Sequence, residues 1–177
     1  MFCPPEVGEI LFKTQLVTVK VLRKMNFEAG GIDLSQYKEG DKCKLPLWLA
    51  KALDENGFVE MVDDNLLTVT ELSKALWKDQ HSSTPLELPE DFYLKTKLTL
   101  SRLRENVRDF DTEKELSSLS MCFEDLVNVR LQKIFQAVRL RADIPDFIKN
   151  LVLEERLLYK QLERVLSKWS KLIRGGL

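Results

Sequence analysis

The sequence predicts an α+β protein in which a small strand-rich N-terminal domain is followed by a larger all-helical bundle domain. Three observations support this prediction. β-branched residues alternate early in the chain, a Ser/Thr/Pro-rich segment follows near its middle, and apolar residues then recur at spacings of three and four. With 177 residues, the chain is long enough to bury a substantial core.

Residues 1–64 are expected to form the small β-rich domain with one short helix. Three residues alternate at period two, as in a half-buried strand: Val17, Val19 and Val21. The Gly30-Gly31 pair marks a turn. A further short strand is predicted over residues 58–62.

Residues 45–53 are predicted to be the helix of this small domain. Pro46 suits the first helical position, because the N–H that proline lacks would have no partner there. Gly57 follows the predicted end, where glycine adopts the left-handed conformation without a Cβ clash. The apolar side chains are expected to cover the strands, and Trp48 in particular is predicted to be a core residue.

Residues 65–88 are expected to contain a short helix and a linker. Thr68 and Glu71 have the spacing of a capping box, which predicts a helix that runs to about Lys78. The Ser, Thr and Pro residues over 81–85 are typical of a linker. The domain boundary is predicted in or near this segment.

Residues 89–177 are predicted to form a bundle of three or four long helices. The first begins near Pro89, and one of its faces is expected to be buried: Phe92, Thr96, Leu100, Leu103, Val107 and Phe110. A second helix is expected to begin at Thr112 and to run for about 28 residues. The last begins at Pro145 and carries a nearly heptad apolar stripe.

The residues that could carry chemistry do not form a catalytic or metal-binding pattern. The single histidine, His81, lies in the linker, and a triad would need it within reach of a nucleophile and a carboxylate. No glycine-rich phosphate loop is present, since a helix start does not follow Gly31. The three cysteines are far apart, which favours a reducing compartment over a disulfide framework or a zinc site. The sequence predicts a non-catalytic protein without cofactor or metal.

The overall charge is nearly balanced, with 27 Lys and Arg against 28 Asp and Glu, so no global field draws the chain onto nucleic acid. Cations nevertheless gather on the second predicted helix and after it: Arg130, Lys133, Arg139 and Arg141. A solvated helix face is the simpler interpretation. Contact with a phosphate or an acidic partner is the other, and it makes a nucleic-acid-binding helical module the alternative function. No apolar run approaches the length of a membrane span.

Apolar residues cover more than one face over residues 147–158. This helix is either central to its own bundle or shared with another chain. The second interpretation is favoured, because obligate interfaces resemble a core cut in half. The candidate interface residues continue along the last helix: Leu151, Leu158, Leu162, Val165, Trp169 and Leu172.

Three segments together resemble motifs of one known family. Residues 45–50 read L-P-L-W-L-A, residues 84–93 read T-P-L-E-L-P-E-D-F-Y, and residues 125–134 read D-L-V-N-V-R-L-Q-K-I. In this order they are similar to motifs of the GINS family of DNA replication proteins, and the resemblance spans most of residues 15–140. The first motif supplies the fold-signature residues Leu45, Pro46, Trp48, Leu49 and Ala50.

The resemblance implies a function and a set of partners. Its β-domain-first order resembles the eukaryotic GINS subunits two and three and their archaeal counterpart, and the short chain is more similar to the archaeal protein. Such a subunit is expected to be a structural part of a hetero-tetramer that bridges the MCM helicase and a Cdc45/RecJ-like protein. The expected location is the cytoplasm, associated with the nucleoid, in an archaeon, or the nucleus in a eukaryote.

Overall fold

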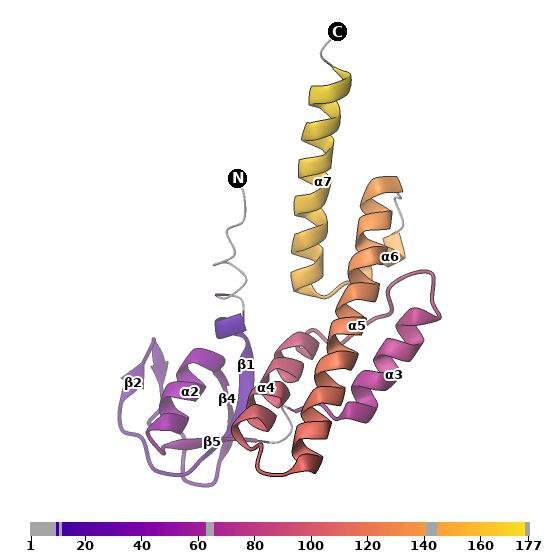
Figure 1. Cartoon of the computed structure of the whole chain (residues 1–177). Coiled ribbons are helices and arrows are strands. Elements are labelled where there is room, and N and C mark those ends of the chain that lie inside the picture. Colours follow the sequence, from indigo (N-terminus) through magenta and orange to yellow (C-terminus); the bar gives the residue numbers. More distant parts are fainter. Residues whose placement is uncertain (1–9, 11, 63–65, 141–144, 176–177) are drawn as a thin grey trace. The chain divides into compact units, whose positions relative to one another are not determined.

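The computed structural model describes residues 10, 12–62, 66–140 and 145–175 (Figure 1). A strand-containing region is followed by a helical region, which confirms the predicted α+β class. The two regions form separate compact units that meet in sequence between Leu66 and Leu67. The boundary expected at the linker over 81–85 is therefore wrong, because the first helix after Leu67 packs with the helical unit.

The strand unit contains a three-stranded antiparallel sheet in the order β4-β1-β5: β1 Leu16–Val21, β4 Lys42–Pro46 and β5 Val59–Met61. The central strand β1 alternates as predicted, with Val17, Val19 and Val21 all buried. A separate two-stranded hairpin is formed by β2 Glu28–Ala29 and β3 Ile32–Asp33.

Helix α2, Leu47–Glu55, packs against all three strands of the sheet. Of the signature residues, Leu45, Leu49 and Ala50 are buried in the core of this unit. Pro46 does not occupy the first helical position but the cap position before it, where its extended backbone also ends β4. Gly57 has φ of +69°, which matches the predicted stop just after the helix.

Trp48 is not a core residue, since 42% of its surface is exposed. Its ring instead lies over the β2–β3 hairpin at Gly30, which has φ of +60°. A Cβ atom at Gly30 would come within 2.5 Å of the ring atom Cη2 of Trp48. The hairpin turn thus requires glycine both for its backbone conformation and for the close approach of the indole.

The helical unit is built around one long helix, α5, against which α3, α4 and α7 pack (Figure 1). Its helices are α3 Val69–Gln80, α4 Phe92–Glu105, α5 Phe110–Leu140, α6 Pro145–Lys149 and α7 Leu153–Arg174. The single last helix expected from Pro145 is wrong. The chain leaves the helical conformation after Lys149 and begins a new helix at Leu153.

The ends of these helices follow from local capping. Thr68 and Glu71 form the predicted capping box, with Thr68 Oγ1 accepting from the Glu71 N–H at 3.2 Å. At the start of α5, Asp109 rather than Thr112 is the cap, because its carboxylate accepts from the Thr112 N–H at 2.8 Å. The helix therefore begins two residues earlier than expected.

Two residues expected on the buried face of the first bundle helix lie outside it. Helix α4 ends at Glu105, so Val107 and Phe110 no longer share the period of Phe92 and Leu100. Both are exposed, and Phe110 keeps 77% of its surface accessible. The helix break, which the apolar spacing did not reveal, is the reason for this difference.

Two apolar cores lie along α5. One joins α3, α4 and the first half of α5: Leu72, Phe92, Leu100, Leu119 and Leu126. The other joins the second half of α5 to α6 and α7: Ile134, Ala137, Val138, Phe147, Leu151 and Tyr159. Between Leu126 and Ile134, the buried face of α5 carries two cations, Arg130 and Lys133.

Candidate functional site

The guanidinium of Arg130 lies between the two cores and is only 1% exposed. It donates to both carboxylates that reach it, from Nη1 to Asp79 at 2.6 Å and from Nη2 to Glu155 at 2.7 Å. It also donates to the backbone carbonyl oxygens of Leu86 at 2.9 Å and Asn150 at 3.3 Å. One side chain therefore ties α3, the linker, α5 and the start of α7 together.

Lys133, one turn further along α5, completes the charge balance. Its ammonium group donates to both the carboxylate and the backbone carbonyl of Asp79, and to the carbonyl of Thr84 at 3.1 Å. Two buried cations thus face two buried anions, Asp79 and Glu155. Such a set is tolerated inside a protein because each charge is paired and hydrogen-bonded.

Glu155 connects the ion network to the first turn of α7. It accepts from the N–H of Val152 at 3.1 Å, and the hydroxyl of Tyr93 donates to it at 2.6 Å. Burial, followed by the negative charge of Glu155, raises the pKa of Tyr93 far above its usual range. Burial lowers the pKa of Arg130, but hydrogen bonding to Glu155 and the nearby acidic groups, first Glu155 and then Asp79, raise it, so that this pKa lies above its ordinary value.

Both interpretations of Arg130 and Lys133, a solvated helix face and a contact with a phosphate or a partner, are corrected by their burial and internal pairing. The spacing of Leu126, Arg130, Lys133 and Ile134 places both cations on the apolar face of the helix, a signal available in the sequence. Their acceptors were missed because they lie 51 and 25 residues away from Arg130 along the chain. Arg139 is exposed, and Arg141 lies outside the described residues.

The candidate interface residues fall into two groups along the chain. Leu151 is 1% exposed and belongs to the core between α5, α6 and α7, so its assignment to an interface is corrected. The unit also buries Phe147 and Val152 from the apolar surplus over 147–158, whereas Leu153 is exposed. Leu158 and Leu162 are half-buried, and Leu162 packs against that core.

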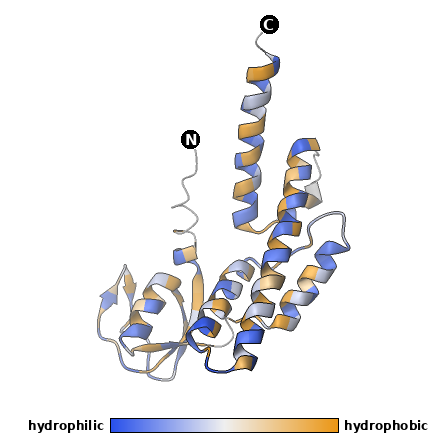
Figure 2. Ribbon diagram, in the orientation of Figure 1, coloured by the Kyte–Doolittle hydropathy of each residue, from blue (hydrophilic) through white to orange (hydrophobic). Residues whose placement is uncertain are grey.

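Beyond Leu162 the apolar stripe of α7 is uncovered. Its exposed members are Val165, Leu166, Trp169, Leu172 and Ile173. Trp169 keeps 59% of its surface accessible and Leu172 keeps 76%. Figure 1 shows α7 extending past the last turn of α5, and Figure 2 shows that apolar bands continue to the end of the helix. An apolar face of this extent is typical of a protein interaction site.

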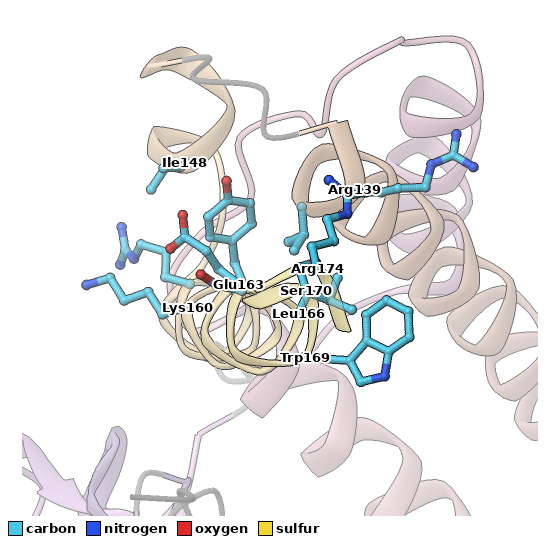
Figure 3. Close-up of a pocket in the computed structure, with 12 residues that line it drawn as sticks. Arg139, Ile148, Lys160, Glu163, Leu166, Trp169, Ser170 and Arg174 are labelled. Carbon is cyan, nitrogen blue, oxygen red and sulfur yellow. The ribbon is translucent and has the colours of Figure 1, made fainter. Parts of the chain in front are cut away.

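A cavity of about 760 Å³ lies beside this face (Figure 3). Figure 3 shows Lys160, Glu163 and Trp169 projecting from α7, and Arg139 from α5. The residues that line the cavity include Val138 of the second core and Leu166 and Trp169 of the exposed stripe. Among the described residues, no group of three His, Cys, Asp or Glu side chains is placed to hold a metal ion.

Residues 66–174 match the family model of the Sld5 type, described as the GINS complex protein helical bundle domain. The match covers more than half of the chain and includes all helices of the helical unit. The chain belongs to the GINS family and is a GINS complex subunit in DNA replication. This family consists of non-catalytic structural subunits, which join other GINS subunits in hetero-oligomers.

A search of curated proteins found no match to the chain. In the described part of the chain, no helix combines the length and the apolar character needed to span a membrane.

Proposed function

We propose that the chain is a scaffolding subunit of the GINS hetero-tetramer, which links the MCM helicase to a Cdc45/RecJ-like protein during DNA replication. The observation that carries this proposal is the match to the GINS helical bundle over residues 66–174. The exposed stripe of α7 from Val165 to Ile173 supports it, because this face is apolar and no described element covers it.

The stripe is proposed as the surface that meets a second GINS subunit. Leu162, just before the stripe, packs against the core around Tyr159, so a partner helix packed on the stripe would extend an existing apolar layer. The ion network at Glu155 fixes the first turn of α7 against α5. The exposed half of α7 is thereby held in one orientation, which favours association with little loss of conformational freedom.

A two-stage binding experiment tests this function. The chain is co-expressed with the GINS subunit of opposite domain order from the same organism, and the mass of the purified complex is measured. The complex is then passed over immobilised MCM and over an immobilised RecJ-like protein. We expect a mixed complex that is retained by both. A complex that forms but is retained by neither would limit the function to assembly alone.

A nucleic-acid-binding helical module is the second candidate function, and the end of α7 favours it. Residues 164–174 contain four cations and no carboxylate: Arg164, Lys168, Lys171 and Arg174. If these residues contact phosphates, DNA affinity should fall steeply with salt because bound counterions are released. Binding of a duplex that is weak and insensitive to salt would remove this candidate.

A further inference from the structure

The cavity beside α7 combines an apolar floor with a cationic rim. Its apolar lining consists of Val138, Ile148, Tyr159, Leu166 and Trp169. Among the described residues, its charged lining consists of Arg139, Arg156, Lys160 and Arg174, with Glu163 as the one anion. The site therefore presents apolar surface and excess positive charge to the same occupant.

Most of this positive charge is not neutralised by the part of the unit that the structure describes. Arg156 donates to Glu90 at 2.6 Å and is paired. Arg139, Lys160 and Arg174 are exposed and form no ion pair with another described residue. An occupant that carries carboxylates would complement all three cations.

The distance between the cations indicates the size of the occupant. Lys160 and Arg174 are fourteen residues apart on one helix, which corresponds to about 21 Å along its axis. A small anion would reach only one of them. A polypeptide segment of about four helical turns would reach both. A nucleic acid backbone would neutralise the cations but leave the apolar surface of Leu166 exposed, whereas an amphipathic peptide would cover both.

We infer that this cavity binds an acidic amphipathic segment of the partner GINS subunit, an inference that rests on the proposed function. Apolar side chains of that segment lie over Leu166, on the side of α7 that faces Val138 and Ile148. Its carboxylates pair with Arg139, Lys160 and Arg174. Charge at the rim then selects the partner and accelerates association, while the apolar floor provides most of the affinity.

Two matched triple variants of the full chain test this inference. The first, called the groove variant, removes three cations that line the cavity and carries Arg139→Gln, Lys160→Gln and Arg174→Gln. The control variant carries Arg104→Gln, Arg108→Gln and Lys114→Gln, which are also exposed and remove the same charge around the start of α5. Each is titrated calorimetrically with the purified partner GINS subunit of opposite domain order at about 50 mM and about 300 mM NaCl. Circular dichroism melts verify that both variants are folded.

We expect the groove variant to bind the partner about tenfold more weakly than the native chain at low salt, and within about twofold at high salt. The control variant should bind the partner within about twofold of the native chain at both salt concentrations. If the groove variant binds as the native chain does at both salt concentrations, the inference is overturned while the proposed function stands. If the native chain itself does not bind the partner, both fail. A loss of affinity for a DNA duplex but not for the partner would reassign the site to nucleic acid.

Discussion

Arg130 makes five hydrogen bonds in the interior of the helical unit, to Asp79, Leu86, Asn150 and twice to Glu155. Replacing it by methionine preserves much of its volume but leaves two carboxylates with too few partners. We expect Arg130→Met to lower the free energy of unfolding by about 3–5 kcal/mol in denaturant titrations.

Arg139→Met is the matched control, since it lies on the same helix but is exposed. It should change the free energy of unfolding by less than about 0.5 kcal/mol. If the two variants were equally stable, the ion network would contribute nothing specific to the fold.

Gly30 offers a second test at the residue scale, because its neighbour Gly31 provides an internal control. Both have positive φ, but only a Cβ at Gly30 would overlap the ring of Trp48. Gly31→Ala should cost about 1–2 kcal/mol for the left-handed backbone alone. Gly30→Ala should cost more, and the excess should disappear in a Trp48→Ala background. Thermal melts of Gly31→Ala, Gly30→Ala, Trp48→Ala and the Gly30→Ala/Trp48→Ala double variant measure these costs. Equal costs at the two glycines would contradict the close contact between Gly30 and Trp48.

At the scale of elements, the segment from Leu151 to the end of α7 changes its environment along its length. Leu151, just before it, is buried in the core, whereas Leu172 near its end is exposed. Leu151→Asp should lower the free energy of unfolding by at least about 3 kcal/mol, since a carboxylate would enter an apolar core. Leu172→Asp should leave stability within about 0.5 kcal/mol and yet abolish recovery of the partner.

Denaturant titration and co-purification together separate these outcomes. A Leu172→Asp chain that unfolds as readily as the Leu151→Asp chain would place the end of α7 inside the unit.

Local patterns predicted those elements whose signals are local. The alternating valines of β1 and the capping box at Thr68 are confirmed, because period and capping are set by residues close in sequence. The break between α6 and α7 was missed, since continuous apolar spacing masks it. The pairing of Arg130 with Asp79 could not be foreseen, because 51 residues separate them and only the packing of α3 on α5 brings them together.

At the scale of the whole molecule, the chain is organised as a strand unit and a helical unit, and its family membership is carried by the helical unit. Within the helical unit, the apolar residues have two different roles. The two cores along α5 stabilise the unit itself. The stripe from Val165 to Ile173 is left for another chain in the proposed assembly.

Hydrogen–deuterium exchange of the full chain, alone and with the partner GINS subunit of opposite domain order, tests this assignment most directly. We expect peptides covering residues 162–174 to become strongly protected in the complex, because their exposed helix face would be buried. Peptides around Arg130 are protected already and should not change. A stable complex in which residues 162–174 exchange as fast as in the free chain would contradict the assignment of α7 as the subunit interface.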